Sequence, residues 1–336
     1  MKAVVVQKPG ALSVIDVPEP RLDDYQALVR TLACSICNGT DRKIYDGTIP
    51  FFGPEGYPGI LGHESVGRVV KVGRKVTAYR EGDLVFRPMA DVPGYTCIWG
   101  GFAEFGAVTD LKALAADGAR AGNCSVHTGQ QVIPGEVDLV EATICVTLKE
   151  VLSFLRALKV NPGDSMLVLG YGPVGLSMAY LAKVVGMGTV IVAGRREEGL
   201  HQAKKFGADE TVNLSTETID GKVRSIAKEG VDLVVDATGK AELVEEAARS
   251  LHPNGRIGMY AVFDRNEPNV EREKLPIASA GPDESKAHDD IMKLWRDGRI
   301  EPEKFITHVL PMGEIGSAFQ LLERRQALKV VINIGG

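Results

Sequence analysis

Three glycines in the stretch "LVLGYGPVGLSMA" constrain the fold of this chain more than any other feature. Gly170, Gly172 and Gly175 follow an apolar, strand-like run and open a helix-like run, the context that a G-x-G-x-x-G dinucleotide loop requires. In such a loop the first glycine permits a tight turn and the second lets backbone N–H groups approach a pyrophosphate. The third lets helix and strand pack closely.

The segments around this loop alternate between strand and helix patterns. Apolar runs such as "SMLVLG", "TVIVAG" and "VDLVVDATG" are each followed by a run with helical character. Strands this apolar are typically buried on both faces, so the alternation predicts a doubly wound parallel sheet. We assign Gly170, Gly172, Pro173, Val174 and Gly175 to a cofactor site at the helix N-terminus. The alternative is a glycine turn in a ligand-free sheet.

The end of the second strand predicts which dinucleotide binds. An acidic side chain there hydrogen-bonds the 2′-hydroxyl of NAD and repels the 2′-phosphate of NADP. Gly194 fills this position, and Arg195 and Arg196 follow. A small residue leaves room and guanidinium groups suit a phosphate, so the sequence favours NADP(H) over NAD(H). The alternative is a solvated helix start in which both arginines lie beside Glu197 and Glu198.

The first part of the chain has a different pattern. Short runs such as "KAVVVQ", "LSVIDV" and "SVGRVVKVG" are separated by Gly, Pro and Asp, which is typical of an irregular, barrel-like β domain. From residue 147 the run "TLKEVLSFLRALKV" has a helical period, and Thr147 with Glu150 forms a capping box that predicts a helix start. The expected fold class is α/β, with a β-rich part and a parallel-sheet part.

Length and composition exclude several classes of protein. The 336 residues suffice for about two domains, and a net charge of −5 without a dense Lys/Arg stripe argues against nucleic acid or an acidic membrane as partner. No apolar run approaches the ~20 residues that cross a bilayer, and no signal peptide is evident, so we expect a cytoplasmic protein. The five cysteines are an odd number, which in a reducing compartment indicates packing residues, ligands or nucleophiles.

Cys37, His63 and Cys145 form a candidate zinc site. A catalytic zinc takes three protein ligands, often thiolates and imidazoles, and keeps a fourth position for water or substrate. Cys145 lies just before the predicted helix start at Thr147, so the helix dipole is expected to favour its thiolate. Two thiolates balance the charge of Zn²⁺ and leave a neutral centre that polarises an alcohol oxygen. Each residue alone has a simpler explanation, since a lone buried cysteine is usually packing.

In its motifs the chain resembles the zinc-containing medium-chain alcohol and polyol dehydrogenases from end to end. The resemblance rests on "CNGTD", "GHESVGRVVKVG", "GDLV", "GGFAEF", "LGYGPVG", "DATG" and "FITHVLPM". It implies a GroES-like catalytic domain over residues 1–150 and 296–336, and a Rossmann dinucleotide-binding domain over residues 151–295. It also implies an NAD(P)-dependent dehydrogenase of secondary alcohols and a homo-oligomer, either a dimer or a tetramer.

The resemblance implies one catalytic zinc per chain. Cys37, His63 and Cys145 match the zinc ligands of the family, and Glu64 matches a carboxylate that supports the metal or ligates it transiently. The four-cysteine lobe that binds a structural zinc in the family is missing, because only Cys97 occurs in the corresponding segment. We therefore predict no structural zinc.

Three further residues match a proton relay. Thr40 matches the hydroxyl that accepts the substrate proton, and Asp41 matches the carboxylate that orients the histidine ligand. Lys43 stands where many members carry a relay histidine, although an exposed lysine explains it equally well. The family motif C-x-[ST]-D is one residue longer here, in "CNGTD", which weakens the assignment of Thr40.

Two other functions fit parts of the sequence. One is a quinone or enone reductase of the zinc-free branch of the same superfamily, which the zinc ligand set argues against. The other is a non-catalytic NADPH-binding protein, whose sequence would be free to lose those ligands. The polar motif "GPDES" favours a polyol, sugar or cyclitol as substrate. Cys34, Cys97 and Cys124 are interpreted as packing residues, and Trp99 as a core residue with a pocket-lining role as the alternative.

Overall fold

The computed structural model describes residues 1–97, 99–120 and 127–335, and it divides into two compact units. The first unit comprises Met1–Lys149 and Asp283–Gly336, and the second comprises Glu150–Pro282. The second junction lies earlier than the predicted one at residues 295 and 296. The reason is that α9 (His288–Arg296) packs within the first unit. The indole of Trp295 donates to Glu141, and the imidazole of His288 packs against Phe86.

Two β-sheets form the first unit. A three-stranded antiparallel sheet has the order β2-β1-β4, and a larger mixed sheet runs β13-β14-β3-β5-β6 with β7 also paired to β3. The predicted hairpin is confirmed, because β1 and β2 pair in antiparallel fashion around a turn at Gly10. The strands of this unit are β1 (Lys2–Lys8), β2 (Ala11–Asp16), β3 (Gln26–Ser35), β4 (Gly59–Ile60), β5 (Glu64–Val72), β6 (Leu84–Phe86), β7 (Phe105–Thr109), β13 (Ile306–Pro311) and β14 (Lys329–Asn333).

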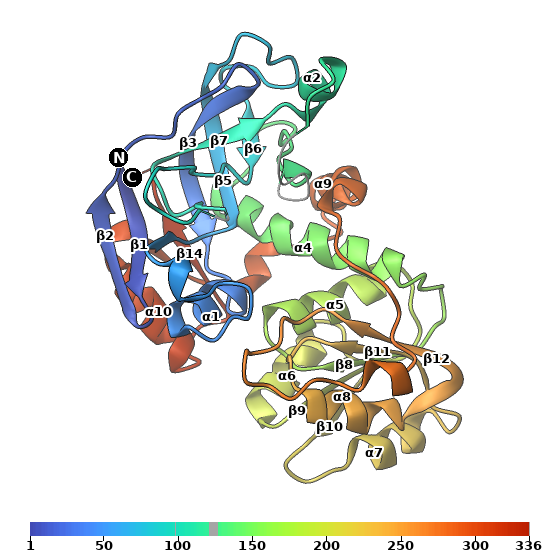
Figure 1. The fold of residues 1–336 in the computed structure, drawn as a ribbon. Coiled ribbons are helices and arrows are strands. Elements are labelled where there is room, and N and C mark those ends of the chain that lie inside the picture. The colour runs from blue at the N-terminus through green and yellow to red at the C-terminus, as the bar shows by residue number, and fades with distance from the viewer. Residues whose placement is uncertain (98, 121–126, 336) are drawn as a thin grey trace. The chain divides into compact units, whose positions relative to one another are not determined.

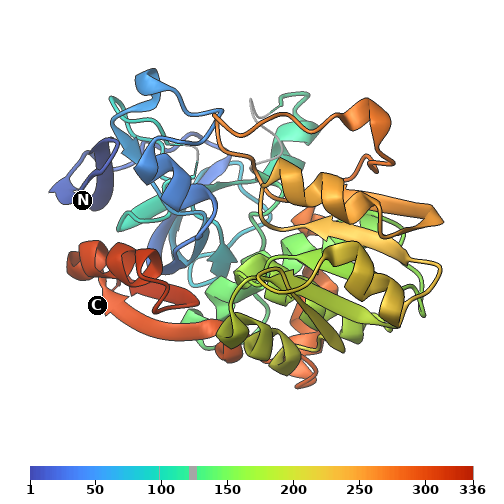
Figure 2. The same cartoon turned by 90° about the horizontal axis from the view of Figure 1, so that it is seen from below.

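Helices cover the ends of these sheets and close the core. The red C-terminal helix α10 lies beside the blue N-terminal strands in both views of the chain (Figures 1 and 2), and its Phe319 packs in one cluster with Val4, Val6 and Cys34. The helices with residues in this unit are α1 (Thr40–Asp46), α2 (Leu111–Ala116), α4 (Leu139–Ala157), α9 (His288–Arg296) and α10 (Ile315–Glu323), with short 3₁₀ turns at Pro54–Gly56, Glu284–Lys286, Pro302–Phe305 and Met312–Glu314.

Helix α4 begins at Leu139, well before the predicted start at Thr147. The carboxylate of Asp138 accepts the backbone N–H groups of Val140 at 2.8 Å and Glu141 at 3.0 Å, which satisfies donors of the first turn. Thr147 therefore lies in the helix interior, and the predicted capping box with Glu150 is wrong. Its hydroxyl is free to make a tertiary contact instead.

The second unit is a five-stranded parallel sheet in the order β10-β9-β8-β11-β12. The four residues of β8 and the five of β9 are all buried, as expected of strands covered on both faces. Helices α5 and α8 lie on opposite sides of this sheet (Figure 1). The elements are β8 (Met166–Leu169), α5 (Pro173–Val184), β9 (Val190–Gly194), α6 (Glu197–Lys205), β10 (Glu210–Asn213), α7 (Ile219–Ile226), β11 (Val231–Asp236), α8 (Ala241–Ala248), β12 (Leu251–Met259) and a 3₁₀ turn at Arg272–Lys274.

The strand order of this sheet places its ligand site. The chain moves outward from β8 to β9 and β10, then returns to the other side of β8 for β11 and β12. In an open parallel sheet, ligands bind outside the carboxyl ends of the strands where this order reverses, which here means after β8 and β11. The predicted α/β fold class, with a β-rich part and a doubly wound parallel sheet, is confirmed. Within the described residues, no helix is long and apolar enough to span a membrane.

Candidate metal and dinucleotide sites

Cys37, His63 and Glu64 come together in the first unit. One ligand atom from each of them lies within 4.8 Å of the other two. Antiparallel pairing of β3 with β5 sets this geometry, because it places Ser35 opposite Glu64 and so brings the loop after β3 alongside the start of β5. Gly62, with φ of 91° and Phe102 packed against it, turns the chain into His63.

Asp41 contacts both segments that carry this group. One carboxylate oxygen accepts the backbone N–H of Cys37 at 2.9 Å, and the other accepts that of Gly62 at 3.1 Å. The second oxygen also lies 3.5 Å from Nδ1 of His63. Burial lowers the pKa of His63, but Asp41 and Cys37 more than offset it, so this pKa is raised well above its ordinary value. Asp41 thus holds both the loop and the imidazole that it faces.

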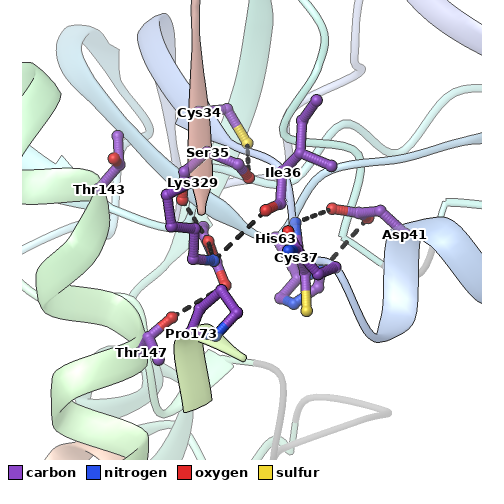
Figure 3. Close-up of polar contacts among 12 residues, drawn as sticks. Cys34, Ser35, Ile36, Cys37, Asp41, His63, Thr143, Thr147, Pro173 and Lys329 are labelled. Atoms are coloured by element: carbon purple, nitrogen blue, oxygen red, sulfur yellow. Dashed lines mark hydrogen bonds and ion pairs between the residues drawn. The ribbon is translucent and has the colours of Figure 1, made fainter. Parts of the chain in front are cut away.

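Glu64 is buried among three donors, Ser35, Thr147 and Lys329, which are labelled in Figure 3. Its Oε2 accepts from the hydroxyl of Ser35 and from the ammonium of Lys329, and its Oε1 accepts from the hydroxyl of Thr147 at 2.9 Å. Burial raises the pKa of Glu64, but Lys329 and His63 outweigh it, so the pKa is lowered. Oε2 accepts two donors and Oε1 accepts one, so Oε1 keeps a lone pair with which Glu64 can ligate a metal.

Cys145 is not part of this group, contrary to the sequence-based assignment. It lies in the interior of α4, fully buried, and the charged groups that act on it are Lys149 and Glu141. Burial raises the pKa of its thiol. The predicted effect of the helix dipole is wrong because α4 begins at Leu139, so Cys145 lies inside the helix and not ahead of it.

The relay residues lie at the start of α1. The backbone N–H of Thr40 donates to the sulfur of Cys37 at 3.4 Å, which places Thr40 next to the metal group. Lys43 lies one turn further along the helix and is half-buried. Trp99 is also half-buried, and its ring centroid lies 4.8 Å from that of His63. The structure therefore favours the site-lining role of Trp99 over core packing.

The motif "GPDES" has a structural role in the fold. Asp283 accepts the backbone N–H of Ser285 and starts a 3₁₀ turn, and Glu284 is buried. The carboxylate of Glu284 lies 2.6 Å from Arg87 and 3.3 Å from Lys149, which is itself fully buried. These contacts explain the motif without a substrate.

The remaining cysteines differ in their surroundings. Cys34 is fully buried in the core cluster that contains Val4, as expected of a packing residue. Cys97 is half-buried against a second cluster, and burial raises the pKa of its thiol to about 11. Cys124 lies outside the described residues.

The residues present fit a zinc ion. Cys37 offers a thiolate, His63 an imidazole held by Asp41, and Glu64 a carboxylate, which together make the set of three protein ligands that catalytic zinc sites use. Thiolate and carboxylate together balance the charge of Zn²⁺. Across the described ranges this is the one group of three or more metal-binding side chains that approach one another.

The glycine loop in the second unit fits a dinucleotide. Gly170 has φ of 96°, and a Cβ added at Gly175 would clash with the carbonyl oxygen of Gly170, so fold geometry explains both glycines. Gly172 is different, because a Cβ added there would meet nothing within 4 Å. Packing does not require this glycine, whereas a pyrophosphate that approaches the backbone does. The α5 N-terminus also has no side-chain cap, and Pro173 occupies its first turn.

The far end of this site is formed by β9 and the residues after it. Gly194 is buried at the end of β9, and Arg195 and Arg196 are exposed. The side chain of Arg195 lies 3.8 Å from Glu242, an exposed pair that contributes little to stability. Arg196 contacts the hydroxyl of Tyr171 with its backbone N–H at 3.1 Å and with Nε at 3.4 Å. Both arginines directly follow the end of β9, where the sequence predicted a 2′-phosphate.

Comparison with known proteins identifies the family. Residues 23–118 match the model of the alcohol dehydrogenase GroES-like domain, and residues 173–281 match that of the zinc-binding dehydrogenases. The first match contains β3 and β5, which bring the metal group together, and the second begins at Pro173, within the glycine loop, and contains β9 to β12. The chain belongs to the zinc-containing medium-chain dehydrogenase/reductase family, and it is an oxidoreductase of the alcohol and polyol dehydrogenase class.

Individual relatives match over nearly the full chain. D-arabinitol dehydrogenase 1 of Uromyces fabae is 24% identical, over 99% of this chain and 97% of its own length. The NADP-dependent isopropanol dehydrogenase of Thermoanaerobacter brockii is 28% identical, over 96% of each chain. Among solved structures, the alcohol dehydrogenase of Thermus sp. ATN1 is 28% identical, with a TM-score of 0.82 over 99% of both chains.

Sequence reasoning missed three groups around Glu64 and one in the glycine loop. Ser35 and Thr147 looked like ordinary polar residues of a strand and a helix, and their contacts are tertiary. Lys329 could have been recognised from the sequence, because a lysine inside the apolar run "LKVVINI" has to be paired if it is buried. Tyr171 stands between two of the loop glycines, where a large side chain needs space.

Proposed function

We propose that this chain is a zinc-dependent dehydrogenase that transfers a hydride between a secondary alcohol and NADP(H). The observation that carries the proposal is the convergence of Cys37, His63 and Glu64, with Asp41 behind the imidazole, in a chain of this family. A polyol, sugar or cyclitol is the favoured substrate class, because D-arabinitol dehydrogenase 1 is among the relatives. The "GPDES" motif no longer supports this choice, since Glu284 is used by Arg87 and Lys149.

When bound, zinc would supply a Lewis acid that lowers the pKa of the alcohol, and the nicotinamide would accept the hydride. The residues of this chain do the rest. Cys37, His63 and Glu64 would hold the metal, and Asp41 faces the imidazole and would keep it in its orientation. Lys329, Ser35 and Thr147 keep Glu64 ionised beside the metal.

The alcohol must lose a proton as well as a hydride. We assign the first step of the proton transfer to the hydroxyl of Thr40, which would accept the alcohol proton and pass its own proton outward by way of the cofactor ribose; Thr40 is the first residue of α1 and lies directly after the loop that carries Cys37. Asp41 is fully engaged by backbone N–H groups and His63, so it orients and does not accept this proton. Lys43 is the next candidate along the relay, and its role stays a prediction.

The preference for NADP(H) over NAD(H) rests on Gly194, Arg195 and Arg196. No carboxylate stands at the end of β9 to bind a 2′-hydroxyl, and Arg195 and Arg196 follow directly in the chain. The relative from Thermoanaerobacter brockii carries NADP dependence in its name, which agrees with this choice.

Metal analysis and a substrate screen test the proposal together. We expect about one zinc per chain, and activity with secondary alcohols or polyols that is higher with NADP⁺ than with NAD⁺ and is lost on chelation. Full activity without metal would favour the zinc-free reductases of the superfamily. Zinc and NADPH binding with no turnover on any alcohol or ketone would favour the non-catalytic alternative.

We also propose that the protein is a homo-oligomer, as dimers and tetramers are typical of the family. Light scattering is expected to give at least twice the single-chain mass of 36.1 kDa. A monomer at micromolar concentration would contradict this part of the proposal and leave the chemistry unaffected.

A further inference from the structure

Tyr171, the residue between the first two glycines of the loop, packs its ring into the end of β9. A Cβ added at Gly194 would overlap ring atoms Cε1 and Cδ1 of Tyr171. A Cβ added at Gly199, in the first turn of α6, would overlap Cε2 and Cζ on the other edge of the same ring. Two glycines therefore flank one aromatic ring, and both are needed to admit it.

The ring is held at its hydroxyl end as well. The hydroxyl of Tyr171 accepts the backbone N–H of Arg196 at 3.1 Å and its Nε–H at 3.4 Å. The guanidinium carbon of Arg196 lies 6.0 Å from the ring centroid, at the limit of a cation–π contact. Tyr171 thus couples the glycine loop to the arginine that borders the predicted phosphate position.

These contacts give Gly194 a second explanation. The sequence suggested that a glycine replaces the acid of NAD-dependent enzymes simply because a phosphate needs room. In the structure the space in front of Gly194 is already filled by Tyr171, so an acidic side chain there would have to displace the ring. The glycine at residue 194 and the tyrosine at residue 171 therefore depend on each other, because the ring leaves no space for an acidic side chain.

We propose that Tyr171 is a specificity-determining residue of the adenosine end of the site. Its ring excludes a carboxylate at residue 194, and its hydroxyl orients Arg196 toward a 2′-phosphate. The acidic groups nearby do not fill this position, since Glu242 faces Arg195 and Glu197 accepts from the side chain of Asn213. The inference rests on the proposed NADP preference for its second part, and on packing alone for its first part.

Calorimetry with two small probes tests both parts without metal or substrate. Adenosine 2′,5′-bisphosphate and 5′-AMP differ in the 2′-phosphate, and both occupy the adenosine end only. One charge-assisted contact changes affinity by ~10–150-fold, so we expect the wild-type protein to prefer the bisphosphate by about that factor. Tyr171→Phe keeps the ring and removes the hydroxyl, and it should lower this preference by about threefold to tenfold. Tyr180→Phe, in α5 of the same unit, is the matched control and should leave the preference unchanged.

The steric part is tested by an acid at residue 194 with and without the ring. Gly194→Asp alone should weaken both probes by about tenfold or more, because the carboxylate and the ring compete for one space. Gly194→Asp with Tyr171→Ala should bind 5′-AMP at least as well as the bisphosphate. Melting temperatures of all variants show whether the unit remains folded.

The results distinguish the steric role of the Tyr171 ring from the role of its hydroxyl. If Gly194→Asp alone binds 5′-AMP tightly and prefers it, the ring is no obstacle and the steric part is overturned. If Tyr171→Phe keeps the wild-type preference for the bisphosphate, the role of the hydroxyl is overturned. A wild-type preference for 5′-AMP would overturn the NADP assignment and the phosphate part, while the two Gly194→Asp variants would still decide the steric part.

Discussion

Cys37 and Cys145 offer a direct comparison at the scale of single residues. Cys37 lies beside His63 and Glu64, whereas Cys145 is enclosed in α4 with no metal-binding partner from that group. Cys37→Ala should remove most of the bound zinc and the activity, since two protein ligands hold zinc weakly. Cys145→Ala should retain wild-type zinc content and cost about 1 kcal/mol of stability through lost packing. Metal analysis of the two purified variants checks this, and zinc loss in Cys145→Ala would restore the sequence-based ligand assignment.

Lys329 and Glu64 form the most enclosed ion pair of the metal region. Their side chains are 2% and 3% exposed, and Ser35 and Thr147 complete the hydrogen bonds of the carboxylate. Lys329→Met would leave a buried carboxylate without its cation and should lower the free energy of unfolding of the metal-free protein by about 3–5 kcal/mol.

The double variant Lys329→Met with Glu64→Gln is the control for this pair. It removes both charges, so it should recover a large part of the lost stability in urea titrations. Equal stability of the single and double variants would show that Lys329 acts through its packing and not through the ion pair.

At the scale of elements, α4 shows what the sequence could and could not predict. Its helical period was readable, but its start was assigned to Thr147 because the capping box is a local signal. The true start depends on Asp138, and Thr147 turned out to bind Glu64, which is remote in sequence. The strand β8, the turn at Gly170 and the helix α5 were predicted correctly, since every residue that defines them lies within one short segment.

The same distinction applies to the site residues. Cys37, His63 and Asp41 were found because motifs of the family carry them in two short stretches of sequence. Lys329 and Tyr171 were missed because their importance comes from partners elsewhere in the chain, Glu64 for the first and Gly194 with Gly199 for the second. Contacts between distant segments are what a single sequence conveys least.

Helix α9 carries a histidine that should make stability depend on pH. Burial, followed by the charge of Lys149, lowers the pKa of His288 from 6.5 to about 4, although Asp289 and Glu284 oppose this. The imidazole packs edge-on against Phe86. Between pH 6.5 and pH 4 the unfolded chain binds a proton at this residue that the folded protein does not. Stability from this group is therefore present above pH 6.5 and is lost as the pH falls toward 4.

The expected loss is at most about 3 kcal/mol over this window. His288→Asn should flatten the dependence of the free energy of unfolding on pH between 6.5 and 4, as measured by urea titration at several pH values. His201→Asn, on an exposed position of α6, is the control and should leave the pH dependence as it is in the wild type. An unchanged slope in His288→Asn would mean that His288 is protonated in the folded protein.

At the scale of the whole molecule, the chain passes between its two units twice, after Lys149 and after Pro282. The ion pair of Lys149 with Glu284 joins the residues next to these two crossings within the first unit. Every residue of the metal group belongs to the first unit, and the glycine loop with Tyr171 and Arg196 belongs to the second. The candidate metal group and the candidate nucleotide loop thus belong to different units of the chain.

This separation predicts that metal and nucleotide load independently. Protein treated with a chelator should lose its activity and still bind NADPH with a dissociation constant within about twofold of the untreated protein.

Conversely, Gly172→Val should fold normally, because its φ is −68° and a Cβ there meets nothing within 4 Å. It should weaken NADPH binding by at least about tenfold, since the side chain occupies the approach of the pyrophosphate, and it should keep its zinc. Fluorescence titration and metal analysis on the same samples measure both quantities. A large loss of NADPH affinity on chelation, or of zinc in Gly172→Val, would show that the two sites are coupled through the structure.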